Sequence, residues 1–597
     1  MANDGTNRWG GRFVVDDMPP ERTATPEDLT EEQLAYGKTA AAFAAAEAAR
    51  APGTARFDAA ATKASLQAAG GLGLLGADVP AAFGGLGLDW SSSTLLAEKL
   101  AAAGSFGLTM NAHAGIGTLP IVLFGTAEQK ARYLPDLAAG KRLAAYALTE
   151  PGAGSDALRL KTTARLSPDG RHYILRGTKQ FVSNAGAADV FVVFAKVDGD
   201  YITAFLVERG MDGFEIGPEE RKMGIDGTST CPLHFEDTPV PAGNVLGEIG
   251  YGHAIAFNVL NIGRFKLAAH CVGGAKEALA SAVRYAGKRK QFGRTLSAFP
   301  LIGAKLADMN IAAYAAESMA YRTAGRLEDA LRGMRADSAA EADGGWEAVS
   351  FMLEEYAIEC SANKIFATEA LDRIVDETLQ IHGGYGYMQG SAAEQMYRDA
   401  RVHRIVEGTN EINRLLIPTA LMKKALRGEL PLLRKARALQ HKLHQPMPLP
   451  AFSEPLAKET YRISQAKIAF LAVGGLAVQK YGLGLEQQQE VMCALADMMI
   501  QIYAMESACL RARKRLLSAE GASGSQLAAE MTAVFVQEGM DRIDAEAKRV
   551  LAALESGDAL QSQLGILRKL MRAPLTDTIG LKRGIAAAVI RTGGYIC

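Results

Sequence analysis

One block of short strand-like runs, set between two long helical regions, limits the fold of this chain more than any other feature. Between about Leu143 and Val245 the sequence consists of β-branched and aromatic runs such as HYILRG, DVFVVFAKV and YITAFLVE, separated by turn residues. Before and after this block, apolar residues recur at helical spacing in Ala-rich stretches. The order helices, strands, helices predicts an α+β protein with a β-barrel-like middle domain.

The chain has 597 residues, too many for one hydrophobic core, because domains average roughly 100–200 residues. We expect an N-terminal tail, an N-terminal helical domain, a middle β-domain, a four-helix bundle and an appended helical domain. Their predicted limits are residues 1–30, 31–142, 143–250, 251–425 and 426–597. The first ~25 residues are expected to be loose.

An internal repeat supports the appended domain. The segment that begins at Leu306, LADMNIAAYAAESMAYR, matches the segment that begins at Leu495, LADMMIQIYAMESACLR, at ten of seventeen positions. Their separation is much longer than the period of a solenoid. The repeat predicts a duplicated helical bundle; chance similarity between two Ala-rich amphipathic helices is the alternative.

Charge and composition exclude several classes of protein. A formal net charge of −1 gives no overall attraction to nucleic acid or to an anionic membrane. The six cysteines are far apart without a CxxC pair, which indicates a reducing compartment and no zinc or other metal site. The N-terminus lacks an apolar signal core, and no uninterrupted apolar run reaches the ~18 residues of a membrane span. We therefore expect a cytoplasmic protein.

Two motifs of the predicted β-domain can bind a ligand. In YALTEPGAGSD, which begins at Tyr146, the glycines let backbone amides approach a ligand, and Thr149 and Ser155 add hydroxyl groups. A structural turn is the alternative, and Glu150 is expected to cap the loop rather than act as a catalytic acid. In GTKQFVSNAG, Phe181 can lie against a planar ring, or it is a core aromatic residue of a strand.

Three later motifs complete the set. KRKQFG places Arg289 before Phe292 in a basic turn that suits a pyrophosphate, with a solvated charge run as the alternative. QIHGGYGYM, from Gln380, offers backbone groups near its adjacent glycines, while its histidine is expected to be structural. RIVEGTNEINR places Glu407 directly before Gly408.

Together, these five segments resemble the acyl-CoA dehydrogenase family in their order and spacing, over about residues 30–425. The length, the appended domain and the segment NIGRFKLAAH are most similar to the very-long-chain subgroup. The resemblance implies FAD as cofactor and an acyl-CoA as substrate. The implied FAD contacts are Tyr146, Leu148, Thr149, Gly154, Ser155, Phe181, Val182, Ser183, Arg289, Phe292, Gln380, Gly383, Gly384, Thr409 and Glu411. The implied substrate contacts are Ser155, Asn261, Arg264 and Gly408.

The resemblance also implies the catalytic base. In this family a glutamate removes the α-proton of the acyl-CoA while the β-hydrogen passes as hydride to FAD. Some members carry that glutamate just before the arginine of the NIGRF-like segment, where this chain has Gly263. The other family position is Glu407, which is therefore the candidate base; a helix-capping role is the alternative.

The acyl tail is implied to lie along HAGIGTLPIVLFGT, which begins at His113. Gly115 and Gly117 would deepen this pocket, unless they only break a helix, whereas Pro120 stands where the very-long-chain enzymes carry a smaller residue. The basic stretch Lys423–Lys442 is a solvated helix face or an attachment to anionic headgroups. It lacks the interleaved aromatic residues of a nucleic-acid site.

The sequence thus predicts FAD-dependent dehydrogenation of medium- or long-chain acyl-CoA to trans-2-enoyl-CoA in fatty acid β-oxidation. Electrons are expected to pass to electron-transferring flavoprotein, and the enzyme is expected to be a homodimer with FAD bound across the subunit interface. Two alternatives remain at this point: an acyl-CoA oxidase that reduces oxygen, and a non-catalytic assembly scaffold.

Overall fold

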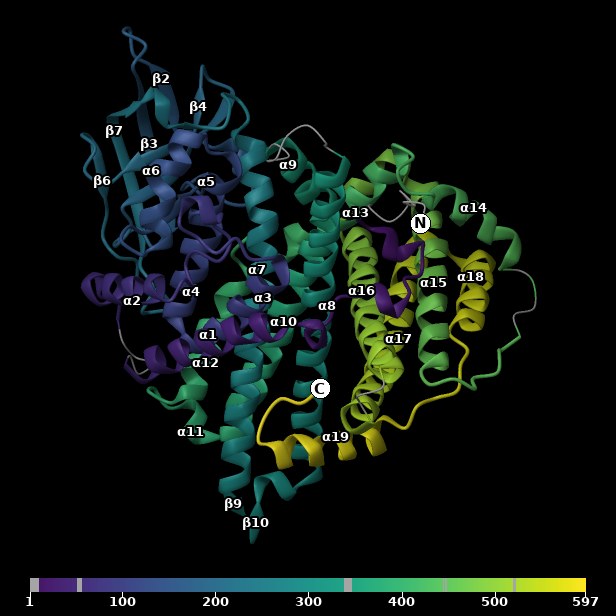
Figure 1. Cartoon of the computed structure of the whole chain (residues 1–597). Coiled ribbons are helices and arrows are strands. Elements are labelled where there is room, and N and C mark those ends of the chain that lie inside the picture. Colours follow the sequence, from purple (N-terminus) through teal and green to yellow (C-terminus); the bar gives the residue numbers. More distant parts are fainter. Residues whose placement is uncertain (1–9, 51–55, 338–345, 444, 446–447, 519–521) are drawn as a thin grey trace.

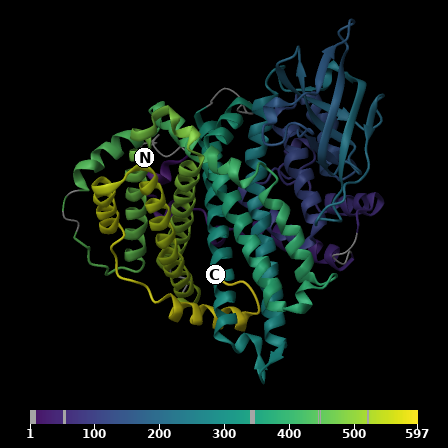
Figure 2. The ribbon, with the colours of Figure 1, turned by 180° about the vertical axis from the view of Figure 1, so that it is seen from behind.

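The computed structural model describes residues 10–50, 56–337, 346–443, 445, 448–518 and 522–597. Long central helices separate a β-domain on one side from the appended helices on the other (Figure 1, Figure 2). This arrangement confirms the predicted α+β fold with an extra helical region.

The first helices pack beneath the β-domain. They are α1 (Glu31–Arg50), α2 (Ala59–Gly71), α3 (Trp90–Leu100), α4 (Ser105–Ala112), α5 (Leu119–Phe124) and α6 (Ala127–Ala138), with a π-helical turn at His113–Gly117. Short polar side chains fix where they begin, because each accepts a hydrogen bond from an otherwise unpaired N–H of the first turn. Asp58 caps α2, Asp89 caps α3 and Thr126 caps α6.

The middle domain is one mixed sheet in the order β6-β7-β3-β2-β4-β5-β8, with β1 parallel to β4. Its strands are β1 (Ala144–Ala147), β2 (Thr163–Leu166), β3 (His172–Ser183), β4 (Val190–Val197), β5 (Tyr201–Glu208), β6 (Phe214–Ile216), β7 (Thr230–Pro241) and β8 (Val245–Leu246). β4 is buried along almost its whole length, which explains its continuous apolar run. The pairing of β3 with β7 shifts register between Lys179 and Val182, and such an irregularity re-aims the side chain between them.

The next region consists of long helices. They are α7 (Gly252–Lys288), α8 (Pro300–Asp337), α9 (Trp346–Glu355), α10 (Ala357–His382), α11 (Gly384–Tyr387), α12 (Ala392–Ala400) and α13 (Asn410–Leu426). A small hairpin of β9 (Lys290–Gln291) and β10 (Arg294–Thr295) joins α7 to α8. The predicted break near Gly383 is present, since that residue has a φ of 60° between α10 and α11.

The appended region is helical, as predicted. It contains α14 (Leu432–Lys442), α15 (Ala457–Tyr481), α16 (Gln489–Leu517), α17 (Ala522–Leu554), α18 (Gly557–Leu570) and α19 (Thr578–Thr592). Three helical stretches of the described chain are long and apolar enough to cross a membrane by length and composition: Ser105–Phe124, Ala457–Gln487 and Gln489–Leu517. The most apolar part of the third stretch is 89 % buried inside the structure, so its apolar character reflects a core helix.

The two copies of the repeat pack against each other in α8 and α16. Their contacts are reciprocal: Arg322 of the first copy pairs with Glu506 of the second, while Arg511 of the second pairs with Glu317 of the first. Each arginine also stacks on the repeat's tyrosine from the opposite copy, Arg322 on Tyr503 and Arg511 on Tyr314. This self-complementary pattern is that of a two-fold interface, here formed within one chain.

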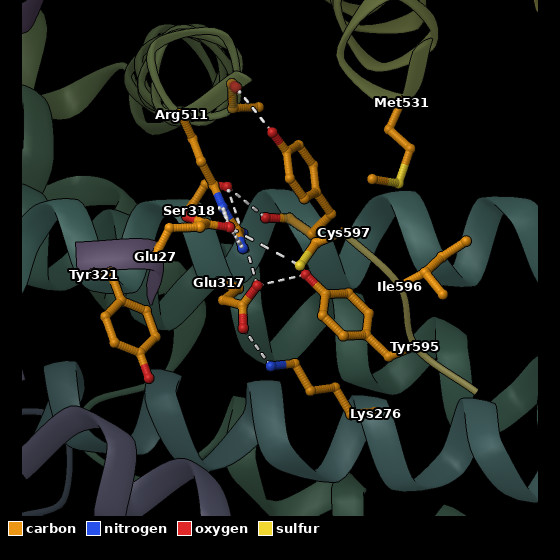
Figure 3. Close-up of polar contacts among 12 residues, drawn as sticks. Glu27, Lys276, Glu317, Ser318, Tyr321, Arg511, Met531, Tyr595, Ile596 and Cys597 are labelled. Carbon is orange, nitrogen blue, oxygen red and sulfur yellow. Dashed lines mark hydrogen bonds and ion pairs between the residues drawn. The ribbon is translucent and has the colours of Figure 1, made fainter. Parts of the chain in front are cut away.

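A buried polar network surrounds Arg511 (Figure 3). Its guanidinium contacts Glu317 at 2.6 Å and Glu27 at 2.7 Å. Glu317 is also bound by Lys276 of α7 and by the hydroxyl of Tyr595, close to the end of the chain. The network therefore joins the N-terminal segment, the central helices and the appended region.

The N-terminal segment differs from the loose tail that the sequence suggested. From Gly10 onward it is packed, with Val14 fully buried and the ring of Phe13 at 4.8 Å from that of Tyr503. The backbone N–H groups of Gly10 and Gly11 donate to two acids, Glu355 and Glu359. Burial of Phe13, Val14 and Val15 in the core of the helical regions outweighs the low propensity of the segment for regular structure.

Candidate active site

Glu407 lies in the short segment between α12 and α13, with its backbone in the left-handed region. Its φ is 57°, followed by 79° at Gly408. Oε2 of the carboxylate is buried and has no hydrogen-bond partner among the described residues. Burial raises the pKa of Glu407 to about 7, and the opposing charges of Arg264 and Lys364 do not cancel this effect. A carboxyl group with a pKa near neutrality suits general-base catalysis.

Side chains of α7 hold the main chain of this segment. Arg264 donates through Nε to the carbonyl oxygen of Glu407 at 3.0 Å, and through Nη1 to Oδ1 of Asn261 at 2.7 Å. Asn261 in turn donates to the carbonyl oxygen of Leu353 at 3.0 Å. Both residues, predicted as substrate contacts, lie at the site and position the backbone of Glu407.

Two further residues of the site escaped the sequence reasoning. Lys364 of α10 and Asn413 of α13 each donate to the carbonyl oxygen of Gly408 at 2.8 Å. Burial lowers the pKa of Lys364 to about 8. The sequence signal that could have identified Lys364 is a lysine within the apolar pattern of α10. A fully buried lysine needs polar partners, so its position indicated a buried polar site.

The loop from Tyr146 to Ser155 approaches Glu407 from the β-domain. The pKa of Tyr146 is raised well above its usual value by burial and by the charge of Glu407. Thr149 accepts a hydrogen bond from the backbone of Gln180 at 2.9 Å, so the loop lies beside the Phe181 segment. Glu150 is structural: it accepts from buried Lys179 at 2.7 Å and from the backbone N–H of Thr162 at 3.0 Å.

The surfaces predicted to contact a flat ring are open. Gly154 and Ser155 are exposed, and no atom lies within 4 Å of a Cβ built at Gly154. Phe181 is 58 % exposed at the register shift of β3, whereas the neighbouring Val182 is buried in the core. Phe181 is therefore an exposed residue, and the alternative that it is a core aromatic residue of a strand is wrong.

A second set of predicted residues lies at the far end of α7. Arg289, Gly383 and Gly384 line one hollow, and the Arg289 guanidinium lies 5.7 Å from the ring centroid of Tyr385. Gln380 is exposed one turn earlier on α10, and Phe292 is 92 % exposed. Since α7 rises about 1.5 Å per residue, Arg289 lies roughly 37 Å from Arg264 along the helix.

Several of the predicted site residues have a strained backbone conformation. Of eight non-glycine residues with positive φ in the described chain, three are Phe181, Phe292 and Glu407. Such conformations cost about 1–3 kcal/mol each and cluster at functional sites. Exposed aromatic rings on strained backbone, beside open glycines, fit the contacts of an aromatic cofactor such as FAD.

The start of α13 closes the site. Thr409 is the N-cap of this helix, and its hydroxyl accepts a hydrogen bond from the backbone of Ile412 at 3.3 Å. Glu411 is exposed in the first turn, where the helix N-terminus favours its negative charge. Thr409 is partly exposed as well.

The segment predicted to line the acyl tail forms the π-helical turn before α5. A Cβ at Gly117 would meet the carbonyl oxygen of Ala144 at 2.9 Å, so close packing against the backbone of Ala144 requires glycine at this position. A Cβ at Gly115 would have only Lys266 nearby, at 3.8 Å. Pro120 is buried in the first turn of α5, a favourable place for proline. Of the two glycines, Gly115 therefore has space beside it.

Comparison with known proteins identifies the family. Models described as acyl-CoA dehydrogenase N-terminal domain and middle domain match residues 30–141 and 145–238. Two models, both described as acyl-CoA dehydrogenase C-terminal domain, match residues 250–422 and 465–569, one on each helical bundle.

Similar proteins agree with this assignment. A probable acyl-CoA dehydrogenase of Bacillus subtilis is 47 % identical over 98 % of both chains. A very long-chain specific acyl-CoA dehydrogenase of Macaca fascicularis is 36 % identical over 76 % of this chain and 70 % of its own. An acyl-CoA dehydrogenase of Bacillus anthracis complexed with FAD superposes with a TM-score of 0.94 at 47 % identity, covering 99 % and 100 % of the two chains. The chain belongs to the acyl-CoA dehydrogenase family of FAD-dependent enzymes.

Proposed function

We propose that this enzyme converts medium- and long-chain acyl-CoA thioesters to trans-2-enoyl-CoA in fatty acid β-oxidation, with Glu407 as the base. The observation that carries the proposal is the carboxylate of Glu407, whose buried Oε2 lacks a partner within the described chain and whose pKa is raised to about 7. A base of this strength can remove the weakly acidic α-proton and hold it.

The chain's own residues orient this step. Arg264, Lys364 and Asn413 fix the main chain around Glu407, so the carboxylate needs little reorganisation to reach a substrate. The backbone N–H of Glu407 donates to no atom of the described chain, and we assign it to the thioester oxygen, where it would stabilise the developing negative charge. FAD, when bound, supplies the hydride acceptor.

Two chains are expected to share each FAD. The exposed residues around Glu407 lie near Arg264 in the first half of α7, whereas those around Arg289 lie at its C-terminal end, roughly 37 Å away along the helix and farther than an extended dinucleotide reaches. A neighbouring subunit that presents its Arg289, Phe292 and Gln380 would complete the site. The pairing of α8 with α16 already covers one face of the bundle within the chain, which favours a homodimer over a tetramer. Light scattering of the holoenzyme tests this, and a tetramer would contradict it.

A long acyl chain is favoured by the space at Gly115 and by similarity to proteins named very long-chain specific. We further propose a cytoplasmic location, peripheral contact with a membrane, and electron-transferring flavoprotein as the electron acceptor.

The deciding experiment is anaerobic bleaching of the flavin by acyl-CoA thioesters of graded length. We expect C12–C18 substrates to reduce the enzyme faster than C4, because each buried methylene adds about 0.8 kcal/mol. An optimum at C4–C6 would contradict the long-chain proposal. Adding oxygen to the reduced enzyme then tests the acceptor: rapid peroxide formation would indicate an oxidase instead.

A further inference from the structure

We propose that the appended region contains a second ligand site, a cavity that binds the chain of one long-chain fatty acid. The cavity lies between α13, α14, α15 and α16, and none of the residues that line it belongs to the Glu407 site. Its volume is about 240 Å³, and its walls include Leu421, Leu432, Phe470, Leu471, Met492 and Leu495. Apolar walls of this kind suit an alkyl chain.

Two glycines in α15 provide the space. Gly474 and Gly475 lie within the helix, where each costs about 1 kcal/mol relative to alanine. Packing does not require them, because a Cβ at Gly474 would have its nearest contact at 3.8 Å and one at Gly475 at 3.6 Å, both ordinary distances. Both residues line the cavity, so their absent side chains leave it open.

Apolar residues around the cavity are also left exposed to solvent. Leu426 is 66 % exposed and Leu483 is 94 % exposed, and both belong to its lining. Of the three apolar helical stretches, the one that contains α15 is the least covered, with 33 % of its most apolar part buried. Bound alkyl groups would remove this surface from water.

The charged side chains around the cavity indicate which head group the ligand carries. Within the basic stretch, Lys424 is bound by buried Glu355, and Lys435 is paired with Asp16 at 3.0 Å. Lys423 lines the cavity, is exposed and has no ion-pair partner among the described residues. Glu486 also lines it. The single positive charge of Lys423 suits one carboxylate, whereas the negative charge of Glu486 disfavours the several phosphates of a CoA thioester.

The test uses the full-length, FAD-loaded enzyme and monomeric hexadecanoate. Calorimetry should detect binding that Gly474→Leu weakens by about tenfold or more, because the new side chain fills the cavity. Gly565→Leu is the matched control, since a Cβ there meets no atom within 4 Å, and it should leave binding unchanged. Lys423→Gln should weaken binding several-fold. Flavin bleaching by acyl-CoA should be the same in all three variants, which separates this site from the catalytic one.

A photoreactive diazirine analogue of hexadecanoate locates the site directly. We expect cross-links in peptides of α13, α15 and α16, and their loss in Gly474→Leu. Unchanged hexadecanoate binding in a folded Gly474→Leu variant would overturn the proposal, as would cross-links confined to other regions. Binding to phosphatidylglycerol vesicles without binding of monomeric hexadecanoate would also overturn it, and would indicate a membrane-facing surface.

Discussion

The carboxylate of Glu407 lies directly over Gly263, so that a Cβ at residue 263 would meet Oε2 of Glu407 at 2.6 Å. A base from either of the two family positions would therefore occupy the same space, reached from α7 at residue 263 or from the segment before α13 at Glu407. Because Glu407 occupies that location, any side chain at residue 263 would have to displace the carboxylate.

Gly263→Ala is expected to preserve the fold and FAD content but to lower the rate of flavin reduction. The added methyl group must displace the carboxylate, and a small misplacement of a catalytic group can cost about 10²-fold. Stopped-flow reduction by a C16 thioester measures this. Gly274→Ala on the same helix is the control, because its Cβ would meet Leu371 at an ordinary 3.4 Å. Equal rates in the two variants would contradict the packing argument.

Glu407→Gln should bind FAD normally and lose turnover by about 10²–10⁴-fold or more, as expected for removal of a positioned general base. Steady-state dye reduction measures the loss. Glu354→Gln, at an exposed acid of α9, should behave as the unmodified enzyme. If the Glu407 variant kept more than about a tenth of the rate, another group would be the base.

The raised pKa of Glu407 makes both activity and stability depend on pH. Activity at low substrate should rise with pH through about 7, as the carboxyl group loses its proton. Stability should move the other way. A carboxyl group with a higher pKa in the folded state holds its proton more tightly there, so its contribution is present below about 4.5 and is lost as pH rises through about 7.

Relative to the unmodified enzyme, Glu407→Gln should therefore be more stable at pH 8, by on the order of 3 kcal/mol, with the difference shrinking toward pH 4.5. Urea unfolding at several pH values, at equal FAD content, measures this. A difference that is independent of pH would show that burial of Glu407 does not raise its pKa.

Arg511→Leu is expected to destabilise the protein by about 3–5 kcal/mol, because it breaks the buried ion pair with Glu317 and removes a partner of Glu27. Arg513→Leu, on the same helix, is the control. Thermal unfolding compares the two.

Deletion of the residues after Arg427 removes Arg511 and should therefore give aggregation rather than a folded tetramer. Recovery of a soluble, flavin-loaded core would contradict this.

Gly115→Val should shift substrate preference toward shorter chains. The space beside Gly115 accepts the side chain, so the fold should persist while the predicted acyl pocket is filled. The ratio of kcat/KM for C16 to that for C8 measures the shift. No change in this ratio would place the acyl tail elsewhere.

The sequence by itself determined the class of fold and the identity of the candidate base. The spacing of apolar residues separated the β-domain from the helices. Glycine and turn residues marked the ends of elements, such as the break at Gly383. Both signals are contained in short stretches of sequence, which is why the sequence alone revealed them. The LADM repeat predicted a second bundle. Its reciprocal pairs, Arg322 with Glu506 and Arg511 with Glu317, could not be read from spacing, since they join residues on different helices.

Tertiary structure alone decided what surrounds the base. Lys364 and Asn413 reach Gly408 from separate helices, and burial of the Glu407 carboxylate, which raises its pKa, depends on the packing of α7 and the Tyr146 loop around it. The order of the N-terminal segment from Gly10 was likewise decided by its burial against the helical regions and its hydrogen bonds to Glu355 and Glu359. Desolvation and long-range packing depend on the whole surroundings of a group, which a linear pattern does not contain.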